Sequence, residues 1–332
     1  MSGFTQENRK IVKYIDLFCG LGAFHQAFDK LTTFSSDITY TCVASCDYDE
    51  GIQKIYEENY NMKPQGDINT IDFKKLPDFD ILCAGFPCQP FSVAGKKEGF
   101  QNQSKGNLFY KLLECIDEKN PSTIFLENVK NLETIHGGVT FQKIKHELQK
   151  RNYNVSYKVL NSKFFGCPQS RSRIYIVCHK KKEFQFPIVT YDIVPVSSIL
   201  DTSVTEFLDF EEKYNIEECE DNGGMMTHKL FNKISGKGGR QGERVYSIDS
   251  CGPTICASSG GPGAKTGLYQ INGKFRTLTV KETLKMFGFP DDFKYESLEN
   301  NKKLLFYLGN SIVVNVLEEI CKELEKQLFK CA

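Results

Sequence analysis

The sequence has no run that approaches about 18 uninterrupted apolar residues, the length from which a membrane-spanning helix is predicted. Residues 1–10 also lack the apolar core of a secretory signal peptide. The 13 cysteines include no Cys-x-x-Cys pair, so zinc knuckles and redox dithiols have no local support. We therefore expect a soluble, cytoplasmic protein with no metal site, whose cysteines are mostly buried as small hydrophobic side chains.

A net charge is absent as well, because 42 Lys and Arg balance 42 Asp and Glu. With 40% hydrophobic and 25% charged residues, the composition excludes a disordered chain, a collagen and a coiled coil. The length of 332 residues exceeds what one domain usually reaches, and it favours a large domain plus a smaller one.

The neutral total conceals two oppositely charged segments. Residues 201–222 carry nine acidic side chains and one lysine, a net charge of −8. Residues 229–276 carry eight basic and two acidic side chains, a net charge of +6, and 12 of the 26 glycines lie within 223–273. Solvated loops and a surface that meets phosphates both explain this pattern, and charge alone does not decide between them.

From residue 12 to 180, short β-rich runs alternate with helical patterns. The expected strands are 14–18, 41–45, 80–85, 123–127, 156–160 and 174–178, and the expected helices include 51–59, 107–117 and 140–151. This alternation predicts an α/β fold with a largely parallel sheet covered by helices on both faces. Ligands of such sheets bind beyond the carboxyl ends of the strands. Helical patterns return at 281–287 and in an amphipathic stretch over about 311–329.

Two chemically suggestive segments follow the first two expected strands. Gly20 and Gly22 form a turn between a strand and a helix, where a backbone without side chains can approach a ligand closely. Asp47 follows the second strand, a position from which an acid often binds a ribose. A helix N-cap explains Asp47 equally well.

Three further segments accompany later strands. Cys88 lies between prolines just after the strand 80–85, in a rigid loop that suits a nucleophile, although a lone Pro-Cys is weak evidence. Glu127 ends another strand and is either a general acid/base or a structural cap. Arg171 and Arg173 precede the strand 174–178, where they either keep an edge strand soluble or clamp an anion or a polar ring.

The order of these elements, followed by Gly309-Asn310-Ser311, resembles the cytosine-5 DNA methyltransferase family over nearly the whole chain. The resemblance implies a Rossmann-like S-adenosylmethionine-dependent methyltransferase domain, a smaller target-recognition domain, and a DNA cleft between them. It assigns 1–200 to catalysis and cofactor binding, 201–279 to target recognition, and 280–332 to a hinge and a C-terminal helix that returns to the catalytic domain.

The resemblance also implies roles for individual residues. Those around the reacting base are Cys88 as the nucleophile, Glu127, Arg171 and Arg173. Those that hold S-adenosyl-L-methionine are Phe18, Gly20, Leu21, Gly22, Asp47, Tyr48, Asp67, Ile68, Gly85, Pro87, Leu108, Asn310 and Ser311. Those that contact DNA are Ser92, Lys96, Lys237, Arg240, Gln241, Arg244, Thr254 and Ser258.

Among the cofactor residues, Asp47 would bind the ribose hydroxyls, Tyr48 and Ile68 would flank the adenine, and Asp67 would contact its amino group. The implied partners are double-stranded DNA and, as a functional rather than physical partner, a restriction endonuclease. A metal and a membrane are not expected. The protein would act as a cytoplasmic, nucleoid-associated monomer.

Chemistry explains why the family needs these residue types. Carbon 5 of cytosine is a poor nucleophile, so a thiolate such as that of Cys88 must first add at carbon 6. A carboxylic acid at ring nitrogen 3 then relieves the negative charge, which requires Glu127 to be protonated and its pKa to be raised. Because a stacked base is out of reach, the cytosine must be flipped out of the duplex.

The resemblance implies a short G+C palindrome as the target, with GCGC as the best single choice and its inner cytosine methylated. Arg240 and Arg244 would bind guanine through its O6 and N7 atoms. Segment 236–247 resembles the recognition segment of a member of this family but has one residue more. Either Arg240 or Gln241 could therefore fill the place of the flipped base. Two alternatives stay open: a tRNA-methylating enzyme of the same family, and a non-catalytic nucleic-acid-binding homologue. The basic glycine-rich segment speaks against the first alternative, and the complete catalytic set speaks against the second.

Overall fold

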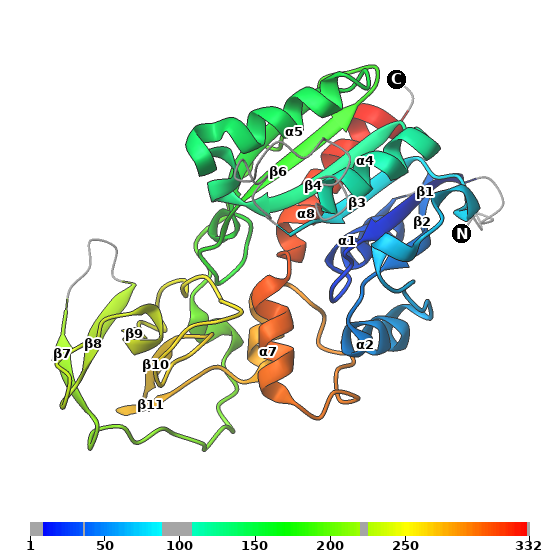
Figure 1. The fold of residues 1–332 in the computed structure, drawn as a ribbon. Helices are drawn as coiled ribbons and strands as arrows, with labels where there is room; N and C mark the ends of the chain where they lie inside the picture. Colours follow the sequence, from blue (N-terminus) through cyan, green and yellow to red (C-terminus); the bar gives the residue numbers. More distant parts are fainter. Residues whose placement is uncertain (1–8, 36, 88–107, 220–224, 331–332) are drawn as a thin grey trace. The chain divides into compact units, whose positions relative to one another are not determined.

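The computed structural model describes residues 9–35, 37–87, 108–219 and 225–330, which form two compact units (Figure 1). The first unit consists of Met1–Leu160, Arg173–Pro187 and Leu317–Ala332, and the second of Asn161–Ser172 and Ile188–Val316. Both units are discontinuous in sequence, whereas the segments expected from the resemblance are continuous. The assignment of functions to 1–200, 201–279 and 280–332 stays a prediction.

The first unit contains a six-stranded sheet in the order β2-β1-β3-β4-β6-β5. Its strands are β1 (Lys10–Leu17), β2 (Ile38–Cys46), β3 (Ile81–Gly85), β4 (Thr123–Val129), β5 (Asn154–Asn161) and β6 (Ser172–His179). Strand β1 pairs in parallel with β2 and β3, and β3 pairs in parallel with β4, whereas β4 and β6 are antiparallel. The largely parallel sheet is therefore confirmed, and every expected strand overlaps an observed one.

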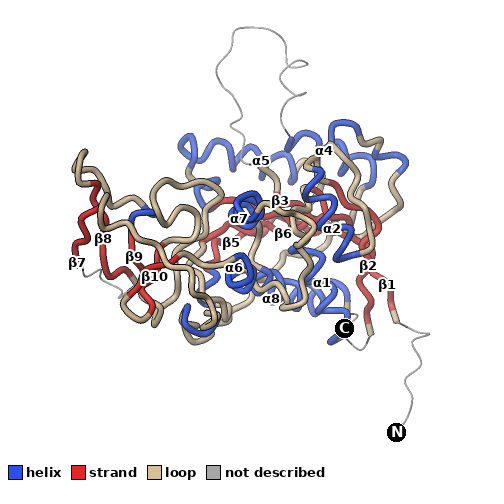
Figure 2. The backbone as a smooth tube through the Cα atoms, turned by 90° about the horizontal axis from the view of Figure 1, so that it is seen from below, coloured by secondary structure: helices blue, strands red, loops and turns tan. Residues whose placement is uncertain are grey.

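Helices cover both faces of this sheet, as expected (Figure 2). Helices α4 (Leu108–Lys119) and α5 (Val139–Gln149) lie on one face, and α1 (Ala23–Phe34) and α8 (Val314–Leu324) lie on the other. Side chains along β4 point alternately to the two faces of the sheet. Ile124 and Leu126 belong to the core cluster beneath α4 and α5. Phe125, between them, packs edge-to-face on Phe24 of α1 at a centroid distance of 5.0 Å. Helix α2 (Glu50–Tyr60) follows β2.

The second unit contains its own five-stranded sheet, in the order β11-β10-β9-β8-β7. The strands are β7 (Tyr214–Glu218), β8 (Met226–Asn232), β9 (Arg244–Tyr246), β10 (Leu268–Ile271) and β11 (Lys274–Arg276). They enclose a small core of Phe210, Leu230, Val245 and Leu268. Helices α6 (Val280–Met286) and α7 (Asn301–Asn310) follow, and a buried ion pair of 2.7 Å between Arg276 and Glu282 joins β11 to α6.

The expected C-terminal amphipathic helix is α8, which continues as a π-helical turn over Glu325–Phe329. The stretch Asn301–Phe329 is long and apolar enough to cross a membrane by length and composition, but 67% of its most apolar window is buried. Helices α7 and α8 have 10 and 11 residues, whereas a membrane span needs about 20. Core helices of soluble proteins pass the same test, so the stretch is weak evidence for a membrane span.

The cysteines behave as the sequence predicts. Of the 11 cysteines in the described part of the chain, nine are buried and two are half-buried. Burial raises the pKa of the Cys46 and Cys167 thiols to about 12. Such thiols are uncharged at neutral pH, and they act as small hydrophobic side chains.

Candidate active and cofactor-binding site

The sheet order places the candidate site at the carboxyl edge of the parallel strands. Strand β2 lies on one side of β1 and strand β3 lies on the other, so the order reverses at β1. Open α/β sheets bind ligands beyond the strand ends at this reversal. The turn at 18–22 follows β1, Asp47 follows β2, Pro87 lies just after β3, and Glu127 lies near the end of β4. The structure thus gathers these predicted residues at one edge of the first unit.

The turn after β1 needs its glycines. Phe18, Gly20 and Gly22 have φ angles of 57°, 51° and 79°, all in the left-handed region that favours glycine. Gly22 is also the N-cap of α1, and a Cβ atom there would lie 2.3 Å from the ring of Tyr60. Any larger residue at position 22 would collide with this ring. The turn therefore depends on Gly22 both for its φ angle and for its packing.

Asp47 reaches back to this turn. Its Oδ2 accepts a hydrogen bond from the Gly20 backbone N–H at 3.1 Å, and its Oδ1 accepts one from the Asp49 N–H at 3.1 Å. Burial raises the pKa of the Asp47 carboxyl, while these N–H groups oppose the shift. The N-cap of α2 is Asp49, whose carboxylate accepts from Gly51 and Ile52. The helix-cap interpretation of Asp47 is therefore wrong.

The other expected cofactor residues differ in exposure. Tyr48 leaves 78% of its surface exposed, so its ring is accessible to a planar ligand, whereas Ile68 is buried in the core cluster. Asp67 accepts hydrogen bonds from the backbone and side-chain amides of Asn69, at 2.9 and 2.8 Å, and caps the turn Ile68–Thr70. Leu108 begins α4 and packs against the same cluster.

Asn310 and Ser311 belong to the second unit, where they end α7. Asn310 is exposed and Ser311 is buried.

Cys88, Ser92 and Lys96 lie outside the described residues, whose first block after β3 ends at Pro87. The start of this loop is nevertheless fixed. The buried Asn128 side chain donates from Nδ2 to the Phe86 carbonyl at 2.8 Å, and its Oδ1 accepts from the Val129 N–H at 2.8 Å. Asn128 thus ties the end of β4 to the backbone two residues before Cys88. No role for Asn128 was predicted from the sequence, although an amide next to an acid at the end of a strand could have indicated one.

Glu127 and Arg173 lie together in the first unit. Glu127 is buried, and the Arg173 Nε is 3.3 Å from its Oε1. The antiparallel register pairs Val129 with Arg173 and Glu127 with Tyr175, so the acid and the arginine share a face as diagonal neighbours. On its other side, Glu127 pairs with Gly85 of β3. A carboxyl and a guanidinium therefore lie next to the strand that leads to Cys88.

Arg171 belongs to the second unit and is buried there. Its Nη1 donates to the Ile255 carbonyl at 2.8 Å, and its Nη2 donates to the Gly309 and Ser311 carbonyls at 2.9 and 2.8 Å. Its guanidinium carbon lies 5.2 Å from the centroid of the Phe287 ring. The two arginines therefore have different partners: Arg173 contacts Glu127, and Arg171 binds the carbonyls of the Gly-Asn-Ser turn.

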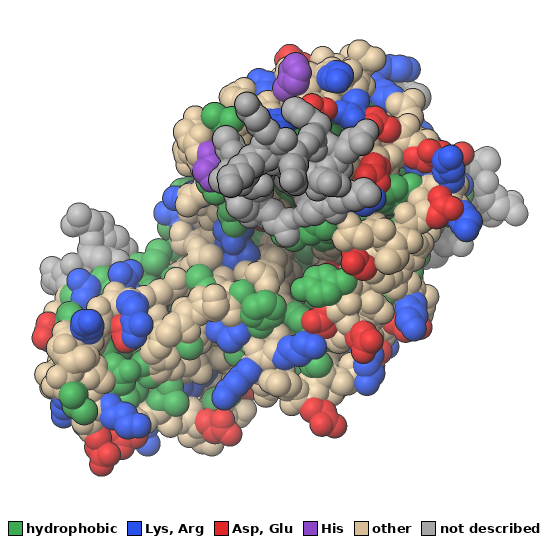
Figure 3. Space-filling model, viewed as in Figure 1, with side chains coloured by type: hydrophobic (Ala, Val, Ile, Leu, Met, Phe, Trp, Pro, Cys, Tyr) green, Lys and Arg blue, Asp and Glu red, His purple; other side chains and the backbone are tan. Residues whose placement is uncertain are grey.

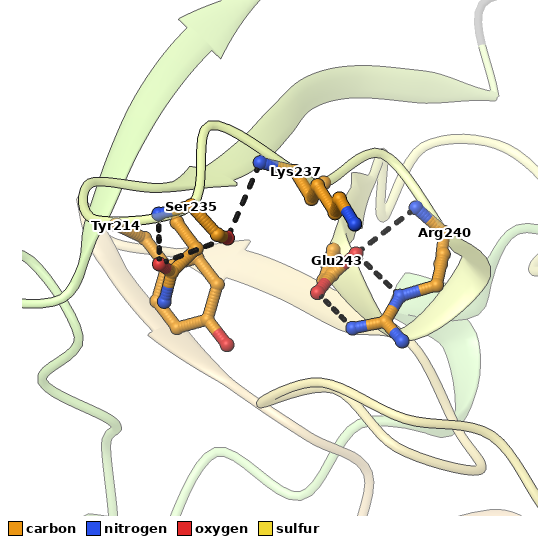
Figure 4. Close-up of a pocket in the computed structure, with 7 residues that line it drawn as sticks. Tyr214, Ser235, Lys237, Arg240 and Glu243 are labelled. Atoms are coloured by element: carbon orange, nitrogen blue, oxygen red, sulfur yellow. Dashed lines mark hydrogen bonds and ion pairs between the residues drawn. The ribbon is translucent and has the colours of Figure 1, made fainter.

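A pocket of about 330 Å³ lies within the second unit, and Lys237, Arg240 and Glu243 are among the residues that line it (Figure 4). The Arg240 side chain turns back in this pocket and donates from Nε and Nη2 to the buried carboxylate of Glu243, at 3.0 and 2.6 Å. These hydrogen bonds hold the pKa of the Glu243 carboxyl below its usual value. Lys237 lines the same pocket and is exposed. Glu243 thus occupies one edge of the Arg240 guanidinium, the edge formed by Nε and Nη2.

Gln241 and Arg244 line a second pocket of about 290 Å³, together with Thr254. The Gln241 Nε2 donates to the Thr254 carbonyl, and the Arg244 Nε donates to the Gly239 carbonyl at 2.7 Å. Within the described part of the chain, the two terminal nitrogens of Arg244 make no hydrogen bond. Arg244 therefore keeps the pair of donors that bidentate recognition requires.

Two glycine-rich loops of this unit pack backbone against backbone. The Gly263 N–H donates to the Gly242 carbonyl at 2.8 Å. A Cβ atom on Gly242 would lie 2.0 Å from the Gly260 carbonyl oxygen, so glycine is required there. The loop that carries Gln241 is thereby fixed to the loop that carries Ser258, which is exposed.

Comparisons with known proteins identify the family. A family model described as C-5 cytosine-specific DNA methylase matches residues 12–326. The chain belongs to this family. It is 37% identical to the type II methyltransferase M.HhaI of Haemophilus parahaemolyticus, over 96% of this chain and 95% of that protein. It is 36% identical to M1.ScrFI of Lactococcus lactis subsp. cremoris, over 98% of this chain and 81% of that protein. The Dnmt2 structure from S. pombe covers 96% of this chain with a TM-score of 0.71, and at 19% identity it supports the fold alone.

As a cytosine-5 DNA methyltransferase, the protein transfers a methyl group from S-adenosylmethionine to carbon 5 of cytosine in DNA. The family match thus favours DNA over tRNA and an enzyme over a non-catalytic homologue. The cofactor suits the edge described above, where an exposed aromatic ring, a buried carboxylate and a glycine turn adjoin. Among the described residues, no group of three or more His, Cys, Asp or Glu could hold a metal ion.

Proposed function

We propose that this enzyme methylates the inner cytosine of GCGC through a covalent adduct between Cys88 and carbon 6 of a flipped base. The observation that carries the mechanism is the Glu127–Arg173 pair beside the strand that leads to Cys88. A buried acid held by a cation next to a cysteine loop suits addition to a ring and relief of the resulting charge.

In this mechanism the Cys88 thiolate adds to carbon 6, and electron density moves to carbon 5. The protonated Glu127 carboxyl donates a hydrogen bond to ring nitrogen 3 and relieves the negative charge, while Arg173 holds the carboxyl in place. Bound S-adenosylmethionine supplies the methyl group. A water molecule then takes the proton from carbon 5, and the electron pair of that C–H bond restores the double bond to carbon 6 and expels Cys88 as a thiolate, so the enzyme is regenerated.

We assign Arg171, the remaining residue of the catalytic set, by its contacts. Arg171 acts on the site indirectly, because its guanidinium is held by three carbonyls of its own unit. We propose that it positions the turn containing Asn310 and Ser311 for the cofactor. Asp47, Tyr48 and the glycine turn are proposed to complete the cofactor site, together with Leu21, Asp67, Ile68, Gly85, Pro87 and Leu108.

For the target sequence, we propose Arg244 as the guanine reader and Gln241 as the side chain that fills the place of the flipped base. Arginine binds guanine O6 and N7 with two donors, and Arg244 has both terminal nitrogens for this purpose, whereas Arg240 spends Nε and one terminal nitrogen on Glu243. Arg240 then fixes the shape of its loop. The remaining proposed DNA contacts are Ser92, Lys96, Lys237, Thr254 and Ser258.

Mapping methylation in Arg244→Ala and Arg240→Ala variants separates these roles. The first variant should lose about 1–3 kcal/mol of discrimination at one guanine, so that sites altered at that base become methylated. The second should methylate the same sequence as the parent, with lower activity. Relaxed specificity in Arg240→Ala and unchanged specificity in Arg244→Ala would show that the assignment is reversed.

The wider setting is proposed on the same basis. We propose a monomer that acts on double-stranded DNA in the cytoplasm, at the nucleoid. A restriction endonuclease of the same specificity would be its functional partner. Size-exclusion chromatography of the pure enzyme checks the monomer, and digestion of its methylated DNA with endonucleases of known specificity checks the specificity that such a partner would share.

A further inference from the structure

A tyrosine outside the predicted site holds the glycine turn. The hydroxyl of Tyr60, the last residue of α2, donates to the carbonyls of Leu21 and Gly22 at 3.0 and 3.1 Å. Its ring occupies the space that a Cβ atom on Gly22 would need. The same side chain thus bonds the turn and shapes it.

The Tyr60 ring is itself fixed by two neighbours. His25 of α1 stacks on it with a centroid distance of 4.1 Å and an interplanar angle of 13°. Tyr56, one turn earlier in α2, lies with its ring centroid 4.5 Å from that of Tyr60, and its hydroxyl is 2.8 Å from the His25 Nδ1. Burial lowers the pKa of His25 to about 4, so the imidazole is neutral at physiological pH. Burial also raises the pKa of the Tyr60 hydroxyl, which therefore keeps the proton that it donates.

Asp47 holds the opposite end of the turn. Its carboxylate accepts from the Gly20 N–H, whereas the Tyr60 hydroxyl binds the carbonyls that follow. Three residues of this turn have positive φ angles, and a non-glycine residue in that region costs about 1 kcal/mol or more. A turn with such angles persists when contacts on both sides determine it. Asp47 supplies one side, and Tyr60 supplies the other.

We propose that Tyr60 is a positioning residue for S-adenosylmethionine. Its hydroxyl holds the glycine turn in the conformation that binds the cofactor, although Tyr60 itself makes no contact with the cofactor. This inference rests on the proposed cofactor site at the turn. Loss of the Tyr60 hydroxyl leaves the Leu21 and Gly22 carbonyls without this donor. Part of the free energy of cofactor binding must then be used to order the turn.

The test compares Tyr60→Phe with Tyr56→Phe. Both variants keep an aromatic ring in the same stack and lose one buried hydroxyl, but only the Tyr60 hydroxyl bonds to the turn. Cofactor Kd is measured by calorimetry, KM and kcat by methyl transfer at saturating DNA, and Tm by thermal melting. Tyr60→Phe should raise Kd and KM for the cofactor about three- to tenfold, the worth of one net hydrogen bond, with kcat nearly unchanged. Tyr56→Phe should lower Tm but leave Kd within about twofold.

An Asp47→Ala variant distinguishes the two ways in which the test can fail. If Asp47→Ala weakens cofactor binding and Tyr60→Phe does not, the positioning role is wrong and the cofactor site stands. If neither variant changes Kd, the proposed cofactor site is wrong as well. An equal rise of Kd in Tyr60→Phe and Tyr56→Phe would indicate general loosening of the stack, and it would also overturn the inference.

Discussion

Replacement of Arg171 by alanine should mainly lower the stability of the second unit, because Arg171 does not contact the reacting base in this account. The guanidinium donates to the carbonyls of Ile255, Gly309 and Ser311, which come from two separate segments of that unit. It also lies over the Phe287 ring. Alanine removes the guanidinium and leaves the three carbonyl oxygens without their charged hydrogen-bond donor. The neighbouring Arg173→Ala is the natural comparison, because that arginine pairs with Glu127 in the first unit.

The expected magnitude follows from the contacts. A buried acceptor that loses its partner costs about 1–3 kcal/mol, and more when the donor is charged. Water and backbone relaxation recover part of this, so the free energy of unfolding should fall by about 3–5 kcal/mol, as when a buried charged partner is deleted. Arg171→Lys should recover less than half, because an ammonium on a flexible stem cannot reproduce the planar fork.

Urea unfolding followed by circular dichroism measures this loss. The two units can unfold in separate transitions, so each variant is compared with the parent transition by transition. Arg171→Ala should shift the transition of the second unit, and Arg173→Ala should leave that transition in place while abolishing most methyl transfer. Loss of methyl transfer in Arg171→Ala with a stability change below about 1 kcal/mol would refute the reasoning. Arg171 would then contact the substrate directly.

Three other predictions concern the cofactor and DNA. Asp47→Ala should weaken S-adenosylmethionine binding by about 1–3 kcal/mol, and unchanged affinity in calorimetry would remove Asp47 from the site. Gly22→Ala should lose cofactor binding and lower Tm, because its Cβ would lie 2.3 Å from the Tyr60 ring; a parental Tm and Kd would contradict this packing. DNA affinity should fall steeply with salt, with a log–log slope of about −0.9 per neutralised phosphate, despite zero net charge. The second unit shows lysine and arginine side chains on the face drawn in Figure 3, and a flat salt dependence would show that 229–276 does not meet phosphates.

The first unit could be predicted because its central strands β3, β4 and β6 are buried on both faces. Strand β3 reads Ile-Leu-Cys-Ala-Gly, a continuous apolar run that ordinary parallel strands show, and the interior of β6 has the same character. Once the sheet is parallel, the residues that follow its strands must meet at one edge. That rule alone brings Asp47 and Glu127 near the glycine turn.

The second unit was harder to predict for physical reasons. Strands β9 and β11 have three residues each, and the core of this sheet holds four fully buried apolar residues, so the alternation is too short to see. Its glycines mark close contacts between loops, such as that of Gly242 with Gly260, which sequence spacing does not reveal. Helix α7 also escaped prediction.

The side-chain roles that were missed depend on tertiary contacts. Arg171 and Arg173 look equivalent as alternate residues, but β6 begins at Ser172, so Arg171 precedes the strand and turns into the other unit. The sequence allowed Asp47 as a helix cap, but α2 begins at Glu50 and its N-cap is Asp49. Tyr60 belongs to no motif, and its contact with Gly22 arises because α2 packs against a turn 38 residues earlier.

Bisulfite sequencing of plasmid DNA from cells that express the enzyme tests the central claim most directly. One experiment establishes the modified base and its sequence context, and a parallel culture with Cys88→Ser tests the nucleophile. The parent should protect the inner cytosine of every GCGC, and the serine variant should protect none. A modified cytosine without guanine beside it, or methylation by the serine variant at a parental level, would contradict the account.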